Sequence, residues 1–214
     1  YRRIAAAILS ASVLAALVLC TWIQVRYWQN SLTIFERAIA VTKNNYKMHI
    51  ELAGLLKDQN RFSEAINHYQ QAVEIAPNDA ESHYRLGDLL RLQGDIDGAI
   101  EHYLFAVRIK PDYAEPHNNL GYTLMSQGRF DEASVHFRQA LQARPGWELP
   151  LNGLAQILAT HYDPQVRDAN EAIALAEQAA EATKYQNATI LDTLAISYAA
   201  AGRFDRAVET AQKA

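Results

Sequence analysis

The chain has 214 residues and a net charge of −4, with acidic and basic residues mixed along its length. A mild and mixed charge without a basic block argues against nucleic acid as a partner. The single cysteine excludes an internal disulfide framework. The chain begins at Tyr1, without a methionine, and we interpret it as a piece of a longer protein.

The first element is an apolar segment. Residues 4–23, IAAAILSASVLAALVLCTWI, carry no charge, and a membrane-spanning helix needs roughly 20 apolar residues. Tyr27 and Trp28 follow it, and such aromatic residues suit the membrane–water interface. We therefore predict a transmembrane helix and its flanks over 1–27, with the lipid bilayer as partner through Ile4–Ile23. The alternatives are a signal peptide and a buried helix that caps a soluble protein.

The charges beside this segment predict its orientation. Arg2 and Arg3 precede it and Arg26 follows, which favours a cytoplasmic start because positive residues collect on that side. The rest of the chain would then be membrane-attached and lie in a periplasm or lumen. The margin is one charge, and residues upstream of Tyr1 could reverse it.

A lone amphipathic helix comes next, over 28–45. Trp28, Leu32, Phe35 and Ala38 recur at helical spacing. We interpret this stretch as the second helix of an incomplete repeat.

The stretches 80–113 and 114–147 align with each other without a gap at a period of 34 residues. Leu86 matches Leu120, Ala99 matches Ala133, and both copies end near a proline. A unit of this length cannot bury its own apolar face, so it must stack on a neighbour. The same pattern extends in both directions. The predicted repeats are 46–79, 80–113, 114–147, a divergent 148–187 with a longer turn, and an incomplete 188–214.

Each repeat predicts two helices joined by a turn. Gly94 and Gly128 occupy the turn in two copies and Asn60 occupies it in the first, because a reversing chain often needs a positive φ. The second helix opens near an acidic residue such as Asp95 or Asp131, which suits the positive end of a helix dipole. In the fourth copy Asp163-Pro164 forces a turn.

This spacing of small and large residues resembles the tetratricopeptide repeat (TPR) family. The resemblance covers about 28–214, and it implies an all-α fold, an α-solenoid whose helix pairs stack into a right-handed superhelix. It also implies protein or peptide binding in the concave groove, which is lined by the first helix of each repeat. The groove positions are Tyr84, Arg85, Asp88, Arg91, Asn118, Asn119, Tyr122, Met125, Asn152 and Gln156. Such side chains can hydrogen-bond an extended backbone and offer stacking area, but they also suit an ordinary polar surface.

Seven histidines suggest a metal site until they are placed on the repeat. His49, His83 and His117 share one repeat position, and His68, His102 and His136 share another. Metal sites need three or four converging ligands, whereas equivalent residues here are a repeat apart. We therefore predict no metal and no cofactor, and interpret the histidines as partly buried, hydrogen-bonded groups at helix contacts.

No arrangement of nucleophile and base and no phosphate-binding loop is visible in the sequence, so we assign no catalytic residue to this chain. Two functions remain. One is a membrane-tethered adaptor that gathers protein partners. The other follows from the junction of the apolar segment with 24–45, which resembles the C-terminal part of polytopic transmembrane-and-TPR protein O-mannosyltransferases. That resemblance implies an acceptor-binding arm whose catalytic part lies upstream of Tyr1.

Overall fold

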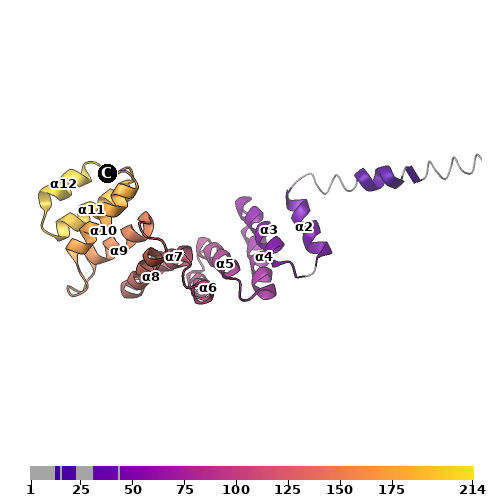
Figure 1. Cartoon of the computed structure of the whole chain (residues 1–214), viewed down its shortest axis with the longest axis horizontal. Coiled ribbons are helices and arrows are strands. Elements are labelled where there is room, and N and C mark those ends of the chain that lie inside the picture. The colour runs from indigo at the N-terminus through magenta and orange to yellow at the C-terminus, as the bar shows by residue number, and fades with distance from the viewer. Residues whose placement is uncertain (1–12, 15, 23–30, 43) are drawn as a thin grey trace, which may run out of the picture. The chain divides into compact units, whose positions relative to one another are not determined.

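The structure is a computed structural model, and it describes residues 13–14, 16–22, 31–42 and 44–214 (Figure 1). The chain forms two compact units, Tyr1–Pro77 and Asn78–Ala214. The described residues form helices joined by turns, without a β-strand. This confirms the predicted all-α repeat fold.

The first unit contains α2 (Ser31–Val41), α3 (Tyr46–Asp58) and α4 (Phe62–Ile75). Leu52 and Leu56 of α3 are buried, as is Tyr69 of α4, and the two helices lie side by side. The turn between them passes through Asn60, whose φ is 60°, as the sequence predicted for this position. An asparagine tolerates this left-handed backbone better than most residues.

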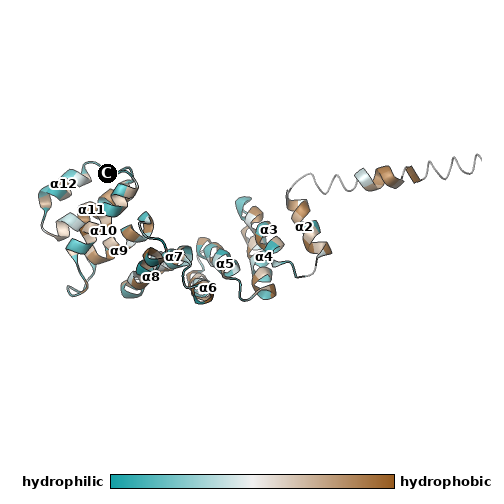
Figure 2. Ribbon diagram, in the orientation of Figure 1, coloured by the Kyte–Doolittle hydropathy of each residue, from teal (hydrophilic) through white to brown (hydrophobic). Residues whose placement is uncertain are grey.

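Part of the predicted membrane segment belongs to the described residues. Residues 13–14 and 16–22 are helical and their apolar side chains are exposed; the ribbon of this segment is largely coloured as hydrophobic in Figure 2. Residues 4–12, 15 and 23 of the prediction lie outside the described residues, as do 28–30 of the predicted lone helix. Among the residues that the structure describes, no helix combines the length and the apolar character needed to cross a membrane.

The second unit is a succession of helix pairs, and consecutive helices contact each other throughout. The pairs are α5 (Ala80–Leu92) with α6 (Ile96–Ile109), α7 (Ala114–Ser126) with α8 (Phe130–Ala143), α9 (Glu148–Thr160) with α10 (Ala169–Ala182), and α11 (Ala188–Ala200) with α12 (Phe204–Ala211). The helix α9 also contacts α7 and α11, so first helices lie against first helices.

Helix ends in the second unit follow local chemistry. The Asp95 carboxylate caps α6 by accepting a hydrogen bond from the Gly98 N–H at 3.0 Å. Asp131 lies in the first turn of α8, where its charge suits the helix dipole, although Arg129 is the capping residue and makes no side-chain cap. The turns use Gly94 and Gly128 at φ of 83° and 75°.

The core of the second unit depends on small residues facing large ones. Phe137 of α8 is fully buried, and a Cβ at Gly121 or Gly153 would lie 2.6 Å or 2.5 Å from its ring. The ring therefore fits between α7 and α9 only because both helices have a glycine there. This close approach brings the first helices together into one face, on which the polar side chains of α5, α7 and α9 meet.

Candidate functional site

A groove of about 390 Å³ lies on the face formed by the first helices of the second unit. It is lined by Arg91, Ile96, Asn118, Asn119, Tyr122, Thr123, Ser126 and Leu149. These residues come from α5, the start of α6, α7 and the start of α9. The lining combines apolar surface with the polar, uncharged side chains of Asn118, Asn119, Thr123 and Ser126, and Arg91 adds a guanidinium group at the α5 end.

Asp88 joins α5 to its neighbours. Its Oδ1 accepts a hydrogen bond from Asn119 Nδ2 at 2.9 Å and one from the Tyr103 hydroxyl at 3.0 Å. The Arg91 guanidinium lies 3.6 Å from the same oxygen. Burial and the nearby carboxylate of Asp88 raise the pKa of Tyr103, so its phenol stays a donor. Asp88 Oδ1 thus links α5 to α6 and α7 through the Tyr103 hydroxyl and the Asn119 amide.

Tyr122 also lines the groove, and its side chain makes structural contacts with α8 and α9. Its hydroxyl donates to the Leu149 carbonyl oxygen at 2.7 Å, and its ring meets Phe137 edge-on at 4.9 Å between centroids. Burial raises the pKa of this phenol. The hydrogen bond fixes the start of α9 against α7.

Asn118 and Asn152 occupy the same position in consecutive repeats, and both side chains are almost fully buried. Asn118 Nδ2 donates to Asn119 Oδ1 at 3.1 Å, but Asn118 Oδ1 has no donor. Asn152 lies against the phenol of Tyr122, whose hydrogen goes to Leu149, so Asn152 Oδ1 also has no donor. Buried carbonyl oxygens without a donor are rare, because each costs about 1–3 kcal/mol.

The structure brings together four of the predicted groove residues, Arg91, Asn118, Asn119 and Tyr122, around one groove. Tyr84 instead packs on the rings of Tyr103 and Tyr113, and Met125 packs on the core.

The remaining predicted residues do not line this groove; among them, Asp88 and Asn152 contact the lining residues Asn119 and Tyr122, respectively. Arg85 pairs with Glu81 at 3.2 Å, and Gln156 is half-buried outside the lining. The lining also includes residues that the sequence did not indicate. Ile96 and Leu149 begin their helices, and only the packing of neighbouring repeats brings these ends to the groove.

Models of the tetratricopeptide repeat match residues 53–90, 87–128, 114–146 and 191–213, which together cover more than half of the chain. The chain belongs to the tetratricopeptide repeat family. As a TPR protein it has a scaffold suited to binding proteins or peptides. No curated protein sequence matches it.

Solved structures with the same TPR fold include YrrB, described as a TPR protein with an unusual peptide-binding site. YrrB has 20% identity, a TM-score of 0.71, and coverage of 84% of this chain and 89% of its own. A MamA protein matches at 19% identity and a TM-score of 0.69, over 80% and 91% of the two chains. MamA from Desulfovibrio magneticus RS-1, from residue 41 to the end, matches at 17% identity and a TM-score of 0.68. The match covers 80% of this chain and 93% of the MamA chain. At these identities the likeness shows the fold alone.

Proposed function

We propose that this TPR module binds an extended peptide segment in the groove over α5, α7 and α9. The observation that carries the proposal is the pair of buried, unpartnered carbonyl oxygens on Asn118 and Asn152. A ligand that donates N–H groups to them would remove the cost of leaving them without a partner. A peptide backbone offers such donors at regular spacing.

The spacing of the two asparagines suits a particular backbone conformation. They lie on α7 and α9, which contact each other, and packed helix axes are about 8–10 Å apart. In a polyproline II segment, residues three apart point the same way and are separated by about 9 Å. The two oxygens can therefore receive N–H groups three residues apart.

The charges around the groove favour an internal segment over a chain terminus. The Arg91 guanidinium is already close to Asp88, and Arg85 is paired with Glu81. A terminal carboxylate would need cations whose charge is not already balanced. YrrB, which shares the fold, is described as having a peptide-binding site, and this supports a peptide as the ligand.

A selection experiment tests the proposal. Peptides would be selected from a random display library against the full chain, and their affinity measured by fluorescence anisotropy. Asn118→Ala is expected to weaken binding about 3- to 10-fold, the value of one neutral hydrogen bond, and Asn152→Ala by a similar factor. Asn170→Ala removes an exposed asparagine from α10 and serves as the matched control. Unchanged affinity in both groove variants would contradict this site.

We also propose that the apolar segment tethers the TPR module to a membrane, with the module on the periplasmic or lumenal side. The exposed apolar side chains of helical residues 13–14 and 16–22 support this, because exposed apolar surface of this kind usually meets lipid or protein. The test is alkaline extraction of membranes from cells that produce the full chain. A variant with Leu14, Leu17 and Val18 changed to Lys is expected to move to the soluble fraction. Extraction of the unchanged chain would refute the tether.

The role of acceptor-binding arm in an O-glycosyltransferase stays a prediction. It depends on the junction of 4–23 with 24–45, part of which lies outside the described residues. The reading frame upstream of Tyr1 separates the two functions, because the enzyme requires several further apolar spans and the adaptor does not.

A further inference from the structure

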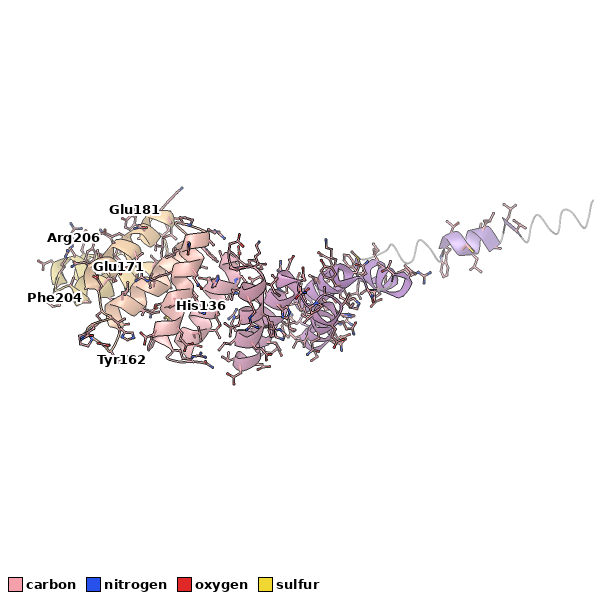
Figure 3. The ribbon with its side chains drawn as sticks, turned by 60° about the horizontal axis from the view of Figure 1, so that its bottom comes forward. His136, Tyr162, Glu171, Glu181, Phe204 and Arg206 are labelled. Atoms are coloured by element: carbon pink, nitrogen blue, oxygen red, sulfur yellow. The ribbon has the colours of Figure 1, made fainter. Side chains whose placement is uncertain are left out.

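Each of the first three repeats contains a histidine on its first helix that contacts a histidine on its second. The Nδ1 atoms are 3.1 Å apart for His49 and His68, 3.0 Å for His83 and His102, and 3.0 Å for His117 and His136. Figure 3 labels His136 on α8. The partners are 19 residues apart in every case. We call these contacts the three histidine pairs.

The third pair shows how the protons are arranged. His117 Nε2 lies 3.1 Å from the Pro111 carbonyl oxygen, which can only accept, so His117 carries its proton on Nε2. Its Nδ1 is then the acceptor, and His136 Nδ1–H is the donor. Both rings are neutral in this arrangement, and a single proton lies between the two Nδ1 atoms.

We propose that the three histidine pairs make the packing of the first three repeats acid-sensitive, holding first helix to second near neutral pH and weakening as the pH falls. A first added proton can go to the Nε2 of the donor ring and leaves the contact intact. A second must go to the acceptor Nδ1, which places two N–H groups and two positive charges against each other at about 3 Å. The contact cannot survive that second proton.

The surroundings of the third pair disfavour even the first proton. Burial, and then the charge of His117, lower the pKa of His136 to about 4. Burial also lowers the pKa of His117, and the bond to Pro111 acts in the opposite direction. The other polar and charged groups near this pair are the Gln139 amide, the Glu132 carboxylate and the Arg129 guanidinium, and the Arg108 guanidinium of α6 lines the same pocket as His117 and His136. Glu132 is paired with Arg129 at 2.7 Å, so its charge is largely balanced.

In the other two pairs the pKa values of His49, His68 and His102 are lowered as well. Burial, and then the charge of His83, lower the pKa of His102. Burial, and then the charge of His68, lower the pKa of His49, and burial lowers the pKa of His68. The carboxylates that oppose these changes are Asp95 and Glu101 at His102, and Glu64 and Glu36 at His68. The Phe105 ring stacks on His83.

The pH window follows from these directions. In the folded state the pKa values of five rings are lowered, those of His49, His68, His102, His117 and His136, whereas the unfolded chain takes up protons at the ordinary histidine pKa of about 6.5. Stability is therefore fully present above about pH 6.5 and falls below it, until the folded rings also protonate, near pH 4 for His136. Within this window, a pair that binds one proton fewer in the folded state than in the unfolded state lowers the folding equilibrium constant about tenfold for each unit by which the pH falls.

The fourth repeat provides an internal comparison. Leu151 and Leu175 occupy the two positions that hold histidine in the first three repeats, and both pack in an apolar core. The repeat fold therefore does not require histidine at these positions. A metal centre does not explain the pairs either, because no three His, Cys, Asp or Glu side chains converge in the part of the chain that the structure describes.

Two of the pairs have a histidine on a helix that also contributes residues to the groove. His83 is on α5 with Arg91, and His117 is on α7 directly before Asn118. If the groove binds peptide as proposed above, acid should weaken that binding too. This consequence rests on the proposed function, whereas the acid sensitivity of the packing does not.

Two measurements on the full chain test the inference. The first is an NMR titration of the histidine rings in the unchanged protein. We expect the Nδ1–H tautomer at His136, the Nε2–H tautomer at His117, and a His136 midpoint near pH 4. Midpoints near 6.5 for all six paired rings would overturn the inference, and this measurement needs no variant.

The second measurement is the urea unfolding of three proteins between pH 8 and pH 4.5. One is the unchanged chain, one has all six paired histidines changed to Leu, and one adds a fourth pair through Leu151→His and Leu175→His. The folding equilibrium constant of the unchanged chain should fall more steeply below pH 6.5 than that of the leucine variant, by about tenfold per pair per pH unit. The four-pair variant should be steeper still. Equal slopes in all three would overturn the inference, whether or not the groove variants lose peptide.

Discussion

We predict that alanine substitution at two helical glycines changes the free energy of unfolding in opposite directions, because only one of the two lies against the buried ring of Phe137. A Cβ at Gly153 would lie 2.5 Å from Phe137 Cζ, and the ring is fully buried and cannot move aside. At Gly54 the nearest atom to such a Cβ is the Tyr69 hydroxyl oxygen, at 3.9 Å. Both positions lie inside α-helices, where alanine is favoured over glycine by about 1 kcal/mol.

The magnitudes differ because only one site has room. Gly54→Ala should raise the free energy of unfolding by about 0.5–1 kcal/mol, since the new methyl group meets ordinary contacts. Gly153→Ala gains the same helix preference but overpacks a filled core, which typically costs about 1–3 kcal/mol and more for contacts this short. We expect a net loss of about 1–2 kcal/mol.

Urea unfolding followed by circular dichroism measures both changes, and hydrogen exchange of the α8 and α9 amides localises the second. A double-mutant cycle decides the mechanism. In a Phe137→Leu background the shorter side chain leaves room for the methyl group, so Gly153→Ala should lose much of its penalty. A penalty that is unchanged in that background, or a Gly153→Ala protein as stable as the unchanged chain, would refute the reasoning.

Three further predictions follow from single contacts. Asp88→Ala removes the acceptor of the Tyr103 hydroxyl and should lower the free energy of unfolding by about 1–3 kcal/mol, measured by urea unfolding. Asp88→Asn keeps an acceptor oxygen and should lower the free energy of unfolding by less. An equal loss in both variants would argue against Asp88 acting as the acceptor for Tyr103. Asp95→Ala removes the cap of α6 and should cost about 1 kcal/mol, with faster exchange confined to the first turn of that helix. The pKa of Tyr113 is raised to about 12, chiefly by burial, so the stability it provides falls above pH 10; an ultraviolet titration with a midpoint near 10 would contradict this.

The sequence predicted the repeat and its turns because these depend on local signals. A positive φ is easiest for glycine and next for asparagine, so the turns at Gly94, Gly128 and Asn60 could be predicted from residue type. The second helix of a repeat also approaches the first helices closely at their glycines. Gly121 and Gly153 show how close that approach is, since both touch the same ring.

The histidines show where sequence reasoning ended. Their recurrence at two repeat positions predicted partly buried, hydrogen-bonded rings at helix contacts. It did not predict that the two positions meet, because this depends on the rotation of each helix about its own axis. The constant separation of 19 residues within His83–His102 and His117–His136 was the available signal. Any pair repeated at fixed spacing within one repeat unit is a candidate for direct contact.

The groove likewise has features that the sequence predicted and features that only the structure shows. The repeat pattern assigned the first-helix residues Asn118, Asn119 and Tyr122 to one face, because helical periodicity fixes which residues share a face. Only the tertiary structure brought in Leu149 and left Asn118 Oδ1 buried without a donor. The sequence by itself thus determined which residues point the same way along each helix. How closely neighbouring helices approach decided which polar groups meet and which stay unpartnered, because hydrogen bonding is lost within about an ångström of displacement.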